Sequence, residues 1–180
     1  LAKARPGTLL RASGGVGTAN HIAGESFQTM SGTRMVHVPY KGTPPALVDL
    51  IGGHVDVLFD TTPSVIGSIK QGKVRALAVT TQKRATALPD VPTVEQAAGI
   101  KGYEANVYTG LLAPAGTPAA TLNRISAEVA KALANPAVRE RFLELGAEPQ
   151  AMSPDEFARF LRDTHAKLGK VITAANIKVD

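Results

Sequence analysis

The sequence predicts an α/β fold with a parallel sheet, followed by a mainly helical C-terminal region. Between residues 8 and 80, short apolar runs alternate with amphipathic stretches, which is the pattern of successive βαβ units. Several amphipathic stretches begin with a hydroxyl residue and a proline and end at a glycine, as helices do. From residue 118 onward the apolar residues recur with helical spacing.

The expected strands and helices of the first part alternate along the chain. Right-handed crossovers would place the helices on the faces of the sheet. Thr43 and Thr62 each precede a proline and are expected to cap helices. Gly52 and Gly72 are expected to follow the ends of these helices. We expect strands at residues 8–12, 35–39, 55–59 and 74–80, and helices at residues 18–30, 44–51 and 63–71.

The second part is expected to begin with a long loop and to continue as helices. Residues 81–102 are rich in proline and glycine and contain one possible helical turn, at 94–98. An extended segment, 103–112, follows. Helices are expected at 118–134, 136–145 and 154–175, with N-caps at Thr117, Asn135 and Ser153, and a short strand at 177–179.

These elements predict two regions joined by a crossover. An α/β ligand-binding lobe is expected at 1–105, a hinge at 106–117, and helices of a second lobe at 118–180. The opening residues, LAKARPG, are typical of the last turn of a helix followed by a breaker pair. We therefore expect the chain to be a fragment that lacks the sheet of the second lobe.

Composition restricts the classes of function. The 180 residues are 44% apolar and 19% charged, as in ordinary globular proteins. The absence of cysteine excludes disulfides, thiol catalysis and cysteine-ligated metals. The net charge of +5 weakly favours anionic partners. Nucleic acid is a poor candidate, because the basic residues are scattered and aromatic residues make up only 4%.

A glycine-rich turn, SGGVGT, lies between the first expected strand and its helix. Ligands of open parallel sheets bind beyond the carboxyl ends of the strands, where this turn is expected. Glycine allows close approach to the backbone, and a helix N-terminus offers unpaired amides. The turn therefore predicts a site for a carboxylate or a phosphate. Its candidate residues are Ser13, Gly14, Gly15, Gly17 and Thr18, with His21 one turn further along.

Two further turns are expected at the same edge of the sheet. Tyr40 and Lys41 follow the second expected strand, and Asp60 and Thr61 follow the third. Lys41 could attract an anion or could be solvated. Asp60 could accept a hydrogen bond from a ligand amine or hydroxyl, or could cap a helix.

Competing interpretations of these motifs remain open. A glycine-rich turn can simply connect a strand to a helix, and this one matches neither G-x-G-x-x-G nor a P-loop. The four histidines show no metal-ligand spacing, so no metal or cofactor is expected. A triad of Ser13, His21 and Asp60 can be imagined, but no G-x-S-x-G motif supports nucleophilic catalysis.

Several longer motifs follow one another along the chain: SGGVGTANHIAGE, MVHVPYKGTPPALVDLIGGHVDVLFDTTPS, GLLAPAGTP, NPAVRERFLELGAEP and SPDEFARFLRD. In this order they resemble the receptors of tripartite tricarboxylate transporters, the Bug family. The resemblance covers essentially the whole chain and is specific.

The resemblance implies a two-lobed, periplasmic-binding-protein-like (type II) fold that closes on a small organic carboxylate. It implies that main-chain groups and ordered waters from one βα loop of each lobe hold the carboxylate, residues 13–18 forming one of these loops. It also implies a periplasmic receptor that delivers its ligand to membrane transporter subunits. Such a protein is not an enzyme.

Two expectations depend on the chain's being shorter than family members. The sheet of one lobe, and with it half of the clamp, is expected to be missing from this chain. The apolar stripe of Leu122, Ile125, Val129 and Leu133 would then lack a partner, which predicts a homodimer or a domain swap. The alternatives to a receptor are an enzyme on the same scaffold and a ligand-sensing module of a regulator.

Overall fold

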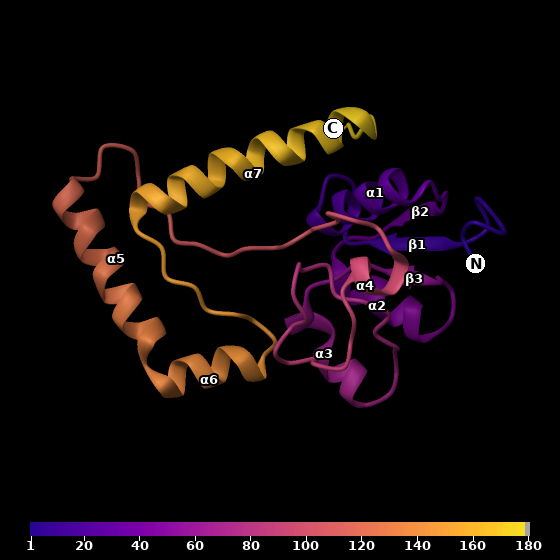
Figure 1. Cartoon of the computed structure of the whole chain (residues 1–180), viewed down its shortest axis with the longest axis horizontal. Helices are drawn as coiled ribbons and strands as arrows, with labels where there is room; N and C mark the ends of the chain where they lie inside the picture. The colour runs from indigo at the N-terminus through magenta and orange to yellow at the C-terminus, as the bar shows by residue number, and fades with distance from the viewer. Residues whose placement is uncertain (179–180) are drawn as a thin grey trace.

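The computed structural model describes residues 1–178 and contains a three-stranded parallel sheet in the order β2-β1-β3 (Figure 1). Strand β1 (Leu10–Ser13) is central and pairs with β2 (Val36–Pro39) and β3 (Val57–Leu58). Arg11 lies opposite His37 on one side and opposite Val57 on the other. The predicted α/β class with a parallel sheet is therefore confirmed.

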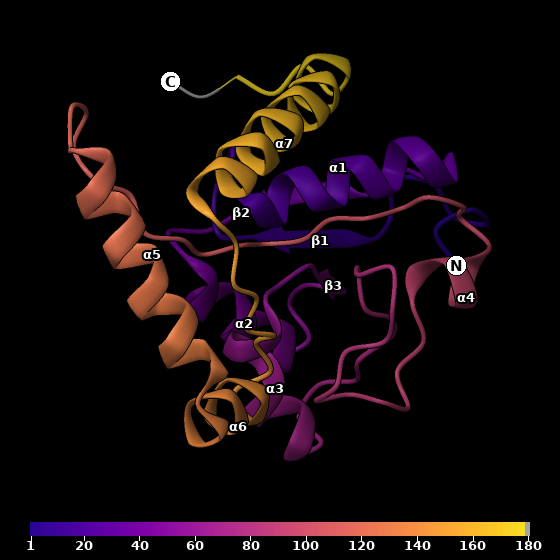
Figure 2. The same cartoon turned by 60° about the vertical axis from the view of Figure 1, so that its left-hand side comes forward.

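Helices cover both faces of this sheet. Helix α1 (Ala19–Ser31) lies on one face, and α2 (Thr43–Ile51) and α3 (Thr62–Lys70) lie on the other (Figure 2). The three helices were predicted to within one residue at each end. Because each helix follows its strand directly, the N-termini of all three lie at the carboxyl edge of the sheet.

Two buried clusters hold this lobe together. One lies between the sheet and α2 and contains Ala12, Ala46 and Val55. The other joins the long loop to α1 and contains Val94, Ile100 and Tyr103, with Phe27 and Phe59 packed against it. Small side chains in the first cluster allow α2 to lie close to β1, which places its N-terminus beside the glycine-rich turn.

The predicted helix caps are only partly correct. Thr43 and Thr62 are the first residues inside their helices, and the caps are Gly42 and Thr61, neither of which makes a side-chain cap bond. The helix that begins at Ala119 is capped by Pro118 and not by Thr117. Asn135 and Ser153 cap their helices as predicted, and Ser153 forms a capping box with Glu156.

The expected strand at 74–80 does not form. Only Val79 makes a bridge, to Thr93 of the long loop. The amide of Val79 donates to the carbonyl of Pro92 at 2.8 Å, so the loop takes the place of a neighbouring strand. An apolar run specifies burial but not a pairing partner, which is why the sequence pattern was misleading here. The expected helical turn is confirmed as α4 (Val94–Ala98).

The C-terminal region contains three helices that follow a long irregular segment. They are α5 (Ala119–Ala134), α6 (Pro136–Glu144) and α7 (Pro154–Ala174). None of their residues is buried in the described chain. Ile177 and Lys178 form no strand, and Val179 of the predicted terminal strand lies outside the described residues.

The C-terminal region contacts the lobe at separate points. Helix α7 packs beside α1 (Figure 1). Lys167 Nζ of α7 lies 3.0 Å from Glu104 Oε2. Glu148 Oε1 accepts hydrogen bonds from the amide and the hydroxyl of Thr86, at 3.1 and 3.0 Å.

No helix in residues 1–178 has both the length and the apolar character that crossing a bilayer would require.

Candidate functional site

Three turns meet at the carboxyl edge of the sheet and are joined by hydrogen bonds. The amide of Gly42 donates to the carbonyl of Gly14 at 3.0 Å, which joins the second turn to the first. Asn20 Nδ2 donates to the carbonyl of Phe59 at 2.6 Å, which joins the start of α1 to the third turn. The structure thus brings the predicted turns together.

The backbone of the first turn requires glycine at two positions. Gly15 has φ of 132° and Gly17 has φ of 76°, which other residues rarely adopt. A Cβ atom on Gly15 would also lie 3.2 Å from the carbonyl oxygen of Tyr40. The two glycines let the chain fold back over the end of β1 and enter α1 at Thr18, whose hydroxyl accepts from the amide of His21 at 3.4 Å.

Several amides of this turn already have partners inside the protein. The amide of Gly15 donates to Ser13 Oγ, and that of Gly17 donates to His21 Nδ1, both at 3.1 Å. The amide of Thr18 makes a long bond of 3.4 Å to the carbonyl of Gly15. The expectation that the amides of the glycines themselves are bare is therefore not met for Gly15 and Gly17.

Other amides of the same turn are without partners. Within residues 1–178, the amides of Val16, Ala19 and Asn20 make no intramolecular hydrogen bond. Ala19 and Asn20 are the first two residues of α1, whose amides cannot bond within the helix. Val16 lies within the predicted loop 13–18, whereas Ala19 and Asn20 lie beyond it and were not predicted. The helix cap at Thr18 is the signal that would have identified Ala19 and Asn20, because the first amides after a cap lack partners within the helix.

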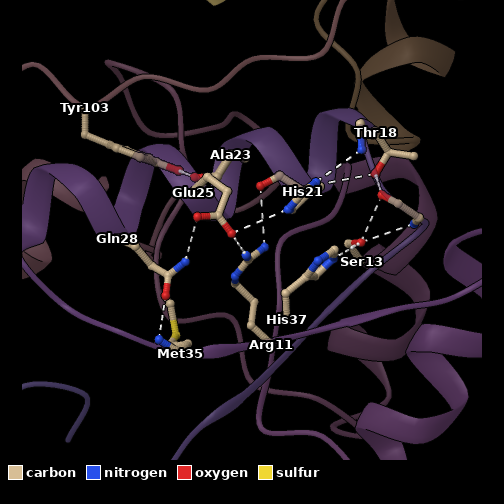
Figure 3. A network of polar contacts seen from close by, with 12 residues as sticks. Arg11, Ser13, Thr18, His21, Ala23, Glu25, Gln28, Met35, His37 and Tyr103 are labelled. Carbon is tan, nitrogen blue, oxygen red and sulfur yellow. Dashed lines mark hydrogen bonds and ion pairs between the residues drawn. The ribbon is translucent and has the colours of Figure 1, made fainter. Parts of the chain in front are cut away.

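A buried polar network lies beneath the turn (Figure 3). The Arg11 side chain is fully buried, forms an ion pair with Glu25 and donates to the carbonyl of His21 at 3.4 Å. Gln28 Nε2 donates to the second oxygen of Glu25 at 3.1 Å. Gly24 leaves the space for the arginine, because a Cβ there would lie 2.6 Å from Arg11 Cδ. The network fixes α1 on the sheet.

Two histidines stack within this network. The rings of His21 and His37 are 3.9 Å apart and nearly parallel, at 7°. His37 Nε2 lies 2.6 Å from Ser13 Oγ. Burial, with the neighbouring His21 and Arg11, lowers the pKa of His37 to about 4. Burial and the Arg11 charge also lower the pKa of His21. Both rings are therefore neutral near pH 7.

This shift predicts that acid destabilises the fold. In the unfolded chain a histidine gains its proton near pH 6.5, whereas folded His37 gains it near pH 4. Between these values the unfolded state binds more protons, so stability falls as the pH drops from 6.5 to 4. We expect urea midpoints to decrease over this range, and to decrease less for His37→Gln. The exposed His165 provides the control: a His165→Gln variant that flattened the profile equally would contradict the assignment.

The remaining predicted site residues lie around the turn but differ in their surroundings. Asp60 Oδ1 accepts from the amide of Thr61 at 2.8 Å and from Asn20 Nδ2 at 3.2 Å. Asp60 Oδ2 is buried without a partner in the described chain. The Tyr40 hydroxyl donates to Asp49 Oδ2 at 2.6 Å, and Lys41 is exposed.

The imagined catalytic triad is not assembled. Ser13 pairs with His37 and not with His21, while Asp60 bonds to Asn20 and the backbone. Within the described residues, no group of three or more potential metal-binding side chains is found. The arrangement offers backbone donors and helix N-termini, which suit binding of an anion.

Comparison with known proteins identifies the family. The model of the tripartite tricarboxylate transporter family receptor matches residues 1–177. The chain belongs to this family. Its members are transporter receptors, that is, binding proteins and not enzymes. The resemblance noted from the sequence motifs is thereby confirmed. The chain spans about half the length of the curated relatives it matches.

Solved structures of similar proteins share the fold. An R. palustris protein solved with adipate is 35% identical, with a TM-score of 0.89, and the match covers 98% of this chain and 58% of that one. The periplasmic binding protein BugD is 32% identical, with a TM-score of 0.83, covering 98% and 60%. MatC from Rhodopseudomonas palustris, solved with malate, is 29% identical, with a TM-score of 0.81, covering 95% and 59%. The periplasmic-binding-protein-like fold is thereby confirmed.

Proposed function

We propose that this chain is the carboxylate-binding part of a periplasmic receptor for a tripartite tricarboxylate-type transporter. Residues 1–105 form the binding lobe, 106–117 the hinge, and 118–180 helices that belong to a second lobe. Delivery to membrane transporter subunits is part of the same proposal. The family match supports the receptor role.

One observation carries the proposal. The N-termini of α1, α2 and α3 meet at one edge of the sheet, where Val16, Ala19 and Asn20 offer unpartnered amides. Each helix N-terminus carries about half a positive charge, so their convergence favours a negatively charged group. Amide donors discriminate a carboxylate from its neutral amide, because the carboxylate only accepts hydrogen bonds.

The relatives support a class of ligand for this site. Adipate and malate, bound by two similar proteins, are both small dicarboxylates. We propose that one carboxylate of such an acid occupies the edge of the sheet, next to residues 13–18. In this proposal His21, Tyr40, Lys41, Asp60 and Thr61 are the neighbouring residues of the bound acid.

Calorimetric titration of the chain with adipate tests the proposal. We expect stoichiometric, saturable binding of adipate, together with a rise in melting temperature that grows with ligand concentration. Adipamide has the same carbon skeleton and no charge, so it serves as the matched control and is expected not to bind. A carboxylate site would be contradicted if adipate and adipamide bound equally well. It would also be contradicted if neither adipate nor malate bound.

The C-terminal helices support a second proposal, concerning assembly. No residue of α5 is buried in the described chain, and Ile125 of its apolar stripe is 44% exposed. We propose that a homodimer or a domain swap covers this stripe. Sedimentation velocity at increasing concentration tests it, and a monomer at all concentrations would exclude it.

A further inference from the structure

The glycine-rich turn is held from below by side chains and not only by its own backbone. Its two glycines with positive φ each donate their amide to a buried side chain: Gly15 to Ser13 and Gly17 to His21. Ser13 is fully buried, and His21 is 7% exposed. Since glycine is the most flexible residue of a chain, these two bonds restrain the positions that would otherwise move most.

The bond to Gly17 defines the state of the His21 ring. Nδ1 accepts the Gly17 hydrogen, so the proton of the neutral ring resides on Nε2. Nε2 faces Glu25 Oε1 at 3.4 Å, and Glu25 is itself held by Arg11 and Gln28 (Figure 3). The carboxylate therefore orients the ring, and the ring orients the turn.

The second histidine completes the support. His37 stacks on His21 and reaches Ser13 Oγ at 2.6 Å, while that oxygen also accepts the amide of Gly15. The burial and the Arg11 charge that depress both pKa values keep the rings uncharged. An uncharged His21 is required, because a proton on Nδ1 would point at the Gly17 hydrogen and break the bond.

We propose that His21 is a positioning residue for the anion site, acting through Gly17, with Ser13 and His37 performing the same role at Gly15. This inference rests on the proposed function. Val16 directly precedes Gly17 and Ala19 lies two residues after it, so the backbone position of Gly17 affects where both amides are held. When Gly17 is released, the donors are no longer held in one arrangement, and ordering them on binding reduces the affinity.

Two substitutions of His21 separate positioning from packing. In His21→Phe, the ring can still stack on His37, but the acceptor for Gly17 is lost. In His21→Asn, the ring is lost, but the side-chain carbonyl stands where Nδ1 stood and can accept the same hydrogen. A packing role predicts that Phe is the better replacement, whereas a positioning role predicts that Asn is.

The first measurement is amide hydrogen exchange by NMR, which needs no ligand. We expect exchange at Gly17 to be at least about tenfold faster in His21→Phe than in His21→Asn at equal global stability. Unchanged Gly17 exchange in His21→Phe would overturn the inference. Should that variant not fold, Ser13→Ala provides the equivalent test at the Gly15 amide.

The second measurement is affinity for adipate. We expect the Kd to rise about tenfold in His21→Phe, which corresponds to the net free energy of about one hydrogen bond. In His21→Asn we expect the Kd to return close to that of the unmodified chain. Affinities that follow thermal stability, with Phe binding better than Asn, would overturn the inference. Failure of the unmodified chain to bind adipate would instead count against the proposed function, and Gly17 exchange would still decide the positioning role.

Discussion

Replacing Arg11 with leucine is expected to lower the free energy of unfolding by about 3–5 kcal/mol. The guanidinium is fully buried on the central strand and is the ion-pair partner of Glu25, which is only 21% exposed. Leucine would leave this partly buried carboxylate without its cation. It would also remove the donor to the carbonyl of His21.

Denaturant unfolding of three variants tests this expectation. Arg11→Leu is compared with the double variant Arg11→Leu/Glu25→Leu. The double variant also removes the carboxylate that Arg11→Leu leaves unpaired, so it should be the more stable of the two. Arg124→Leu is the matched control, because it breaks an arginine–glutamate pair on the surface of α5 and should change stability little. If Arg11→Leu is no less stable than Arg124→Leu, the buried pair does not hold the lobe together.

The sequence predicted the helices well because their boundaries are encoded locally. Caps, prolines and glycines lie within a few residues of the helix they delimit, as at Ser153, which caps α7 as expected and forms a capping box with Glu156. Strand formation depends on a partner that is distant in the chain. The apolar residues 74–80 resemble a strand, but the loop at Pro92 and Thr93 occupies the pairing position of Val79.

The same distinction applies to the candidate site. The sequence identified the turn, because its glycines lie at a strand–helix junction. It could not show which amides are free, since this depends on Ser13 and His21 turning back onto the glycines. Arg11 illustrates the limit most clearly. In the sequence it interrupts an apolar run, and only the packing of α1, with Gly24 facing it, shows that the arginine is buried.

Substituting Ala19 with proline is expected to weaken the binding of adipate roughly 10- to 150-fold, the equivalent of losing one charge-assisted hydrogen bond of about 1.5–3 kcal/mol. Ala19 is the first residue of α1, and its amide has no partner within the described chain. Proline removes this hydrogen. It is well tolerated at the first helical position, and Thr18 before it is extended, with ψ of 161°, as a residue preceding proline should be.

A second alanine in the chain makes this experiment specific. Ala119 is likewise the first residue of its helix, α5, and follows a residue with ψ of 139°. Ala119→Pro therefore makes the same chemical change away from the glycine-rich turn, and both variants should retain the melting temperature of the unmodified chain. If calorimetry gave the two variants the same affinity for adipate, the amide of Ala19 would not be a ligand donor. A loss confined to Ala19→Pro places the carboxylate at the N-terminus of α1, because the two proteins differ only in which helix lacks its first amide hydrogen.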